Sequence, residues 1–296
     1  MKPEKKKEIR VDGLWQKLAN SRDRQPAGQP QHQTMKKSLT LSILTGLSLP
    51  VFGASYSQDF TAADGTTDLN DGSTIGSNNG VGQIISNALQ LTNTETTGTR
   101  SSFRIPALAN SSQGWTATFD YVLADAPGGN PPADGFTFNY GNIPALTTNG
   151  AANNGHGGAE SGFGGNVISF QVDTWQNGAA NSPGVGILQG QGALAGGRVD
   201  GTVVPTNGGV SGTATITWAP LTTDFTTTGL VTNANFSGIS HSLAGDDSYS
   251  WAFSARTGGA TQDLLIDNLR ITAVPEPSGI LLLGLGAFGL FLNRRR

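Results

Sequence analysis

Only 13% of the 296 residues are charged and 42 are glycine, a composition that argues against a coiled coil or helical bundle and favours one all-β sandwich or two smaller domains. The chain contains no cysteine, which excludes a disulfide framework, a zinc finger and a thiol nucleophile. Between two terminal segments, residues 58–273 carry five basic and sixteen acidic residues, a formal charge of −11 that excludes a protein tracking nucleic-acid phosphates.

The first 34 residues differ in composition from everything that follows. Residues 1–34 are rich in Lys, Gln, Arg and Pro and show no apolar period. This composition predicts a disordered leader. The alternative is that the segment is not translated and the chain starts at Met35.

A secretory signal peptide is predicted over residues 35–57. Two lysines come first, an apolar run covers Leu39–Phe52, and small residues follow, which is the three-part layout of such peptides. Gly53 or Ser55 suits the last position before cleavage. The alternative is a short buried helix, which the lysines beside the run and the lack of a polar face disfavour. The signal implies the Sec machinery as the export partner.

Apolar and polar residues alternate in five segments of the body, residues 58–273. A period of two predicts strands with one buried face. The Gly-, Asn- and Pro-rich stretches between them predict turns. The body is therefore predicted to be an all-β sandwich or jelly roll in one domain. The alternating apolar positions are Trp115, Ala117, Phe119, Tyr121 and Leu123; Phe136, Phe138 and Tyr140; Ile168, Phe170 and Val172; Ala214, Ile216 and Trp218; and Tyr249, Trp251 and Phe253.

Three segments of the body share their order and spacing with one protein family. They are Ala133–Phe138 (ADGFTF), Gly155–Asn177 (GHGGAESGFGGNVISFQVDTWQN) and Tyr249–Ile271 (YSWAFSARTGGATQDLLIDNLRI). These segments resemble the L-type (legume-lectin-like) lectins. The resemblance implies a concanavalin-A-like jelly-roll sandwich for residues 58–273, and glycans or an exopolysaccharide as the partner.

The resemblance also implies which residues bind the sugar. Asp134 matches the acceptor of sugar hydroxyl groups, which often follows a cis Ala-Asp peptide bond. Asn177 matches the amide donor and Trp175 the aromatic ring that stacks on the sugar, while backbone N–H groups near Gly157 and Gly158 complete the site. Carboxylate, amide and ring also suit a sugar chemically, since its hydroxyls donate and accept and its C–H face is apolar. Without the family, Asp134 fits a turn residue and Trp175 a core aromatic.

Calcium is an open question as a cofactor. In the family, the ion is bound by residues that match Asp173, the carbonyl of Trp175 and the Asn177 side chain, and by a second Asp downstream. Here that downstream region holds Asn181. Three protein ligands would hold calcium weakly unless Asn181 or another residue joins, because the ion takes about six to eight oxygens.

A transition-metal site is not expected. The family builds this site with a Glu and a His, and the matching positions here are Gln171 and Gly184. His156 and His241 have no His or carboxylate at metal-ligand spacing. We predict that both histidines are surface-loop residues.

Glycoside hydrolases of the laminarinase type share this jelly roll and are the main rival class. Their strand signature places two carboxylates where this chain has Gln171 and Gln176. An amide can act neither as the acid nor as the nucleophile or base of glycoside hydrolysis. We therefore predict a non-catalytic carbohydrate-binding protein. A structural surface or matrix protein that binds no sugar is the further alternative.

Residues 274–296 form the last segment. Pro275, Glu276 and Pro277 precede an apolar run, Ile280–Leu292, and then three arginines. This pattern resembles the PEP-CTERM sorting signal of Gram-negative bacteria, and its apolar run predicts a hydrophobic helix that anchors the chain transiently in the inner membrane. The resemblance implies processing by an exosortase and delivery to the cell surface or the extracellular polysaccharide matrix. A permanent single-span anchor is the alternative.

Overall fold

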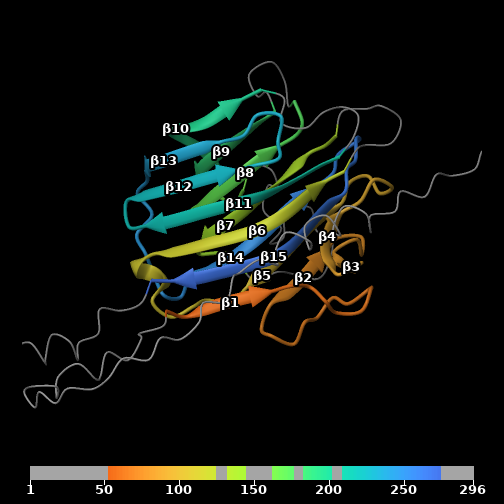
Figure 1. Ribbon diagram of the computed structural model, residues 1–296, viewed down its shortest axis with the longest axis horizontal. Helices are drawn as coiled ribbons and strands as arrows, with labels where there is room; N and C mark the ends of the chain where they lie inside the picture. The colour runs from red at the N-terminus through yellow and green to blue at the C-terminus, as the bar shows by residue number, and fades with distance from the viewer. Residues whose placement is uncertain (1–52, 125–131, 145–161, 177–182, 202–208, 275–296) are drawn as a thin grey trace, which may run out of the picture. The chain divides into compact units, whose positions relative to one another are not determined.

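The body is a sandwich of two antiparallel β-sheets that lie face to face (Figure 1). This computed structural model describes residues 53–124, 132–144, 162–176, 183–201 and 209–274. The architecture confirms the predicted all-β jelly-roll class. The expected signal helix and C-terminal hydrophobic helix lie outside the described residues, as does the leader.

One sheet has eight strands and the other has seven. The eight-stranded sheet has the order β13 (Asn235–Ser240), β12 (Thr222–Thr227), β11 (Val210–Ala219), β6 (Trp115–Leu123), β15 (Leu264–Ala273), β4 (Ala88–Thr92) and β3 (Gln83–Ile85), and β1 (Ser55–Gln58) also pairs with β15. The seven-stranded sheet has the order β10 (Gly192–Asp200), β9 (Gly184–Gln189), β8 (Val167–Asp173), β7 (Gly135–Gly141), β14 (Ser250–Arg256), β5 (Arg100–Ile105) and β2 (Thr74–Ser77). Because β14 lies between β7 and β5, residues far apart in the sequence become neighbours.

Helical structure is scarce in the described ranges. The 3₁₀ turn η1 (Ser111–Gln113) is the one helical element assigned there. Nothing in those ranges is a helix of the length and apolar character that crossing a membrane requires.

The apolar faces of both sheets form one core. The five segments with alternating residues are confirmed as β6, β7, β8, β11 and β14. At the centre, the ring of Trp115 stacks on Trp218 with 6.3 Å between centroids, and it meets Tyr140 and Trp251 edge-on at 5.1 and 5.7 Å. Burial of these large rings supplies much of the free energy that holds the sheets together.

The opposite face of the seven-stranded sheet is polar, yet it is also covered. Asn139, Ser169 and Ser254 point away from the core and are at most 1% exposed. Phe163 forms a small apolar cluster on this face. The neighbouring Gly162 has φ +70°, and a Cβ at this position would lie 2.1 Å from the Ser169 Oγ. Gly162 therefore lets the chain approach the sheet closely.

Strand β1 is part of the folded body although it starts before residue 58. In β1, Ser55 lies opposite Thr272 of β15. Tyr56 is buried, and its hydroxyl donates to Oδ2 of Asp71 at 2.8 Å. Strand β1 therefore starts within the segment 35–57 that the sequence predicts as a signal peptide, because a four-residue strand is too short for its alternation to stand out there.

Candidate functional site

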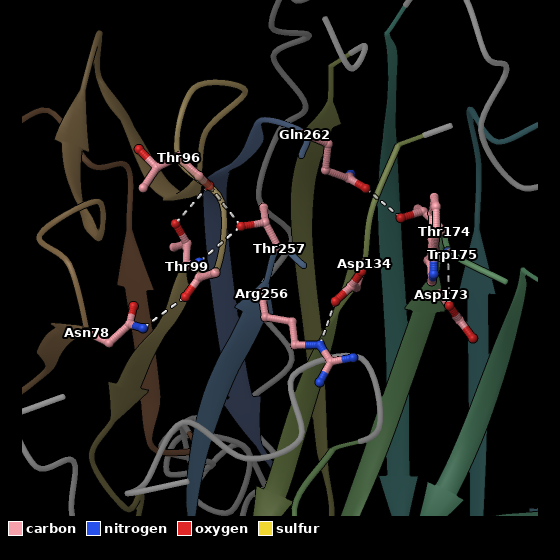
Figure 2. A network of polar contacts seen from close by, with 11 residues as sticks. Asn78, Thr96, Thr99, Asp134, Asp173, Thr174, Trp175, Arg256, Thr257 and Gln262 are labelled. Carbon is pink, nitrogen blue, oxygen red and sulfur yellow. Dashed lines mark hydrogen bonds and ion pairs between the residues drawn. The ribbon is translucent and has the colours of Figure 1, made fainter. Parts of the chain in front are cut away.

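The turn at Ala133–Gly135, here called the ADG turn, lies beside the end of β8. Asp134 precedes β7 and follows a cis peptide bond to Ala133, as the family resemblance implied. The Asp134 backbone N–H donates to the Arg256 carbonyl at 3.0 Å, and the Asp134 carbonyl accepts the N–H of Thr174 at 3.1 Å. Since β7 lies between β14 and β8, the turn is bonded on both sides. Figure 2 shows Asp134 between Arg256 on one side and Thr174 on the other.

The Asp134 carboxylate is buried and paired with a cation. Its Oδ2 lies 2.6 Å from the Nε of Arg256, and its side chain is 5% exposed. Burial raises the pKa of Asp134 above its ordinary value, although Arg256 and Arg100 oppose the shift. The ion pair uses Oδ2, so within the described part of the chain Oδ1 keeps its capacity to accept a hydrogen bond. A desolvated carboxylate of this kind is a strong acceptor for a donor that reaches it.

Gly258 closes one side of the Asp134 carboxylate. A Cβ at Gly258 would lie 3.3 and 3.4 Å from the two carboxylate oxygens. The backbone of the segment after β14 therefore lies close enough to the acid that a side chain at this position would make a tight contact with it.

Trp175 follows β8 directly and is half-buried. Its backbone N–H donates to Oδ1 of Asp173 at 3.1 Å, which forms a tight turn at the strand end. Among the described residues, Trp175 belongs to neither buried apolar cluster. The residue is partly buried and is not one of the core aromatics of the described body.

The segment after β14 is bonded on both sides (Figure 2). The Thr174 hydroxyl donates to Oε1 of Gln262, which is 1% exposed. On the other side, the Thr257 hydroxyl donates to the carbonyl of Thr96 at 2.9 Å and accepts the N–H of Thr99 at 3.0 Å. These bonds fix the position of Arg256 relative to the ADG turn.

Asp173 is fully buried and faces an arginine on another strand. Its Oδ2 lies 3.5 Å from the Nη2 of Arg198, an ion pair too long to count as a hydrogen bond. The Nη1 of Arg198 donates to Oε1 of Gln171 at 2.6 Å, and its Nε donates to Oδ1 of Asp200 at 2.6 Å. Burial raises the pKa of Asp173 to about 6, while the Trp175 N–H and the guanidinium lower it.

The described residues at Asp173 do not fit a calcium ion. Oδ1 of Asp173 accepts the Trp175 N–H, and Oδ2 already faces the positive charge of Arg198. Within the described ranges, no group of three or more His, Asp or Glu side chains is placed to hold a metal. The third expected ligand, Asn177, lies outside those ranges.

The prediction that His241 is a surface-loop residue is wrong. Its side chain is buried, its ring stacks on Trp218 with 5.6 Å between centroids, and its Nε2 lies 3.1 Å from the Ala219 carbonyl. Burial lowers the pKa of His241, which favours the neutral ring. The misassignment arose because the chain turns back over the end of β11 after β13, which no local pattern reveals. His156 lies outside the described residues.

The C-terminal residues 273–296 match the family described as the PEP-CTERM protein-sorting motif. The sorting signal expected from Pro275, Glu276 and Pro277 is therefore present. It marks the chain for export and membrane-anchored sorting in Gram-negative bacteria. Residues 275–296 lie outside the described ranges.

Solved structures share the architecture of the body. The basic winged bean lectin, solved with Tn-antigen, is 16% identical with a TM-score of 0.55, covering 75% of this chain and 99% of that chain. Peanut lectin (17% identical, TM-score 0.54) covers 74% and 97%, and the lectin from Bauhinia forficata in complex with GalNAc (17%, 0.53) covers 75% and 98%. The body has the legume-lectin fold. No curated protein sequence matches this chain.

This legume-lectin fold brings together two of the five predicted sugar-binding residues, Asp134 and Trp175. Asn177, Gly157 and Gly158 lie outside the described residues. Sequence reasoning assigned no role to Arg256, although it lies in the quoted segment Tyr249–Ile271. The signal that was available is that Arg256 is one of only five basic residues in an acidic body.

Proposed function

We propose that the body binds carbohydrate, without catalysis, through Asp134, Trp175 and Asn177 together with backbone N–H groups near Gly157 and Gly158. The observation that carries the proposal is the hydrogen bond from the Thr174 N–H to the Asp134 carbonyl at 3.1 Å. This bond joins the turn that bears a desolvated carboxylate to the turn that bears the partly buried Trp175. The two groups match the two faces of a sugar, its hydroxyls and its C–H surface.

The sorting motif supports a proposal about where this binding takes place. We propose that the leader, residues 1–34, and the signal peptide, within residues 35–57, are absent from the mature protein. An exosortase then acts near the PEP triplet and removes the rest of residues 274–296. The body is released or attached at the cell surface or in the extracellular polysaccharide matrix, where glycans are abundant.

Absence of hydrolysis is part of the proposal. The Oε1 of Gln171 accepts a hydrogen bond from Arg198 at 2.6 Å, and Gln176 is an exposed amide. Neither side chain can deliver a proton or attack an anomeric carbon. We expect no release of reducing ends from β-glucans. Sustained release that a change at another carboxylate abolishes would contradict this expectation.

A glycan array with the full-length protein in mild detergent tests the proposal. Asp134→Ala removes a charged acceptor worth about 1.5–3 kcal/mol, so affinity for the glycan found should fall roughly tenfold to hundredfold. Trp175→Ala should also weaken binding, whereas Trp175→Phe keeps a stacking ring and should retain most of it. A chelator should have a small effect on glycan affinity, because the positive charge beside the Asp173 carboxylate already comes from Arg198.

Asp267→Asn is the matched control, since Asp267 is another partly buried carboxylate but lies in the eight-stranded sheet. It should leave glycan affinity unchanged. Melting temperatures must accompany every affinity, to separate loss of the site from loss of the fold. A folded Asp134→Ala variant with unchanged affinity would contradict the proposed site. An array without any ligand would favour a structural surface protein.

A further inference from the structure

Asp173 is a buried carboxylate that needs a cation inside the protein. Its side chain has no solvent exposure, and an ionised carboxylate in such a place is costly unless a positive charge or several donors compensate it. The same residue shapes the Trp175 turn, because its Oδ1 accepts the Trp175 N–H. Whatever compensates Asp173 therefore also supports the position of the indole.

The strand register brings Arg198 to this carboxylate across an intervening strand. Gly186 of β9 lies opposite Arg198 of β10 on one side and Gln171 of β8 on the other. Two residues away on β9, Gly184 lies between Asp173 of β8 and Asp200 of β10 in the same way. Both positions of β9 are glycines, so no side chain stands where the Arg198 side chain crosses this strand toward β8.

The fit at these glycines is close. A Cβ at Gly186 would lie 3.2 Å from Oε1 of Gln171 and 3.6 Å from the Nη1 of Arg198. A Cβ at Gly184 would lie 3.1 Å from Oδ1 of Asp200 and 2.5 Å from a backbone carbonyl. A larger residue at either position would displace the atoms that surround the guanidinium.

All three guanidinium nitrogens of Arg198 face side-chain oxygens. Nη1 donates to Gln171 and Nε to Asp200, each at 2.6 Å, and Nη2 lies 3.5 Å from Asp173. The planar fork of arginine suits such a set of acceptors, which a lysine ammonium could not match in the same way. A divalent cation at Oδ2 of Asp173 would meet this fixed positive charge.

We propose that Arg198 is the internal cation of the Asp173–Trp175 turn, and that it stands in place of a divalent metal. Arg198 is thus a positioning residue for Trp175 and need not touch the glycan. The glycan-binding consequence rests on the proposed function, whereas the effect on stability does not.

Thermal unfolding of the full-length protein in detergent tests this role. The wild-type melting temperature should change by less than about 1 °C in EDTA or in millimolar calcium. Arg198→Gln should lower it by about 5–10 °C, because it leaves a buried carboxylate unpaired. Arg198→Lys should recover part of that loss, since it keeps the charge but not the fork. Arg270→Gln, at an exposed arginine of β15, is the control and should change nothing.

A double-mutant cycle shows whether the effect runs through Asp173. Arg198→Gln should cost much less in an Asp173→Asn background, because no buried charge then remains to compensate. Equal costs in both backgrounds would contradict the pairing. A fall of more than about 3 °C for the wild type in EDTA, restored by calcium, would overturn the proposal outright. This wild-type comparison decides the matter even if Arg198→Gln does not fold.

Glycan affinity separates this inference from the proposed function. If both hold, EDTA leaves wild-type affinity unchanged and Arg198→Gln weakens it about tenfold through the displaced indole. If the melting temperatures behave as expected but no glycan binds, the role of Arg198 stands and the proposed function fails.

Discussion

Replacing Arg256 with glutamine should destabilise the body in a pH-dependent way. Breaking a buried ion pair by removing one partner costs roughly 3–5 kcal/mol. The Arg256 side chain is 28% exposed and Asp134 is 5% exposed, so solvent screening reduces the expected loss at pH 8 to about 2–3 kcal/mol. For a body of this size, that loss corresponds to a fall in melting temperature of about 5–10 °C.

The pH dependence follows from the direction of the Asp134 pKa. Burial already raises this pKa and Arg256 opposes the shift, so removing Arg256 raises the folded-state pKa further above the unfolded value. Stability that depends on the protonated acid is present at low pH and is lost as the pH rises through the folded-state pKa. The variant should therefore lie closer to the wild type at about pH 4 than at pH 8.

Calorimetry of the full-length protein at both pH values measures the effect. Arg104→Gln is the matched control, because Arg104 lies on the same sheet but its Nε donates to the Ser250 hydroxyl instead of a carboxylate. It should cost less than about 1 °C and show no dependence on pH. Equal melting temperatures for Arg256→Gln and wild type at pH 8, or an equal loss at both pH values, would refute the reasoning.

Three further predictions concern other parts of the chain. Burial raises the pKa of Asp267 to about 6, so Asp267→Asn should stabilise the body by about 1 kcal/mol above pH 7 and by nothing near pH 4, as urea unfolding would show. Gly162→Ala should destabilise it by more than about 1 kcal/mol, while Gly164→Ala, whose Cβ would meet nothing closer than 3.9 Å, should not; equal effects would contradict the close approach at Gly162. Mature protein from the native host should start after Gly53, which keeps β1 whole, and should lack residues 281–296; an intact mass that includes them would indicate a permanent anchor.

Local patterns in the sequence determined the class of fold and both terminal signals. Alternation such as that of Trp115 to Leu123 predicts a strand with one buried face, since side chains on a strand point to opposite sides in turn. The sorting signal is equally local, because it consists of contiguous residues. The short strand β1 was missed, since Ser55–Gln58 offers only four residues beside an apolar run.

The candidate site was predictable only in part. Asp134 and Trp175 stand in recognisable segments, and the fold places their turns together as expected. Their neighbourhoods were not predictable, because the burial of Asp134 and the partial burial of Trp175 depend on the strands that pack beside them. Whether Asn177, Gly157 and Gly158 join them stays a prediction.

Only the tertiary structure decided which cations meet the buried acids. Arg256 is 122 residues from Asp134 in the sequence, and they pair because β14 lies beside β7. Arg198 reaches Asp173 across β9 because glycines stand opposite both residues on that strand. Such contacts depend on strand order and register, which long-range packing determines, and a linear sequence shows only the spacing of residues along one strand.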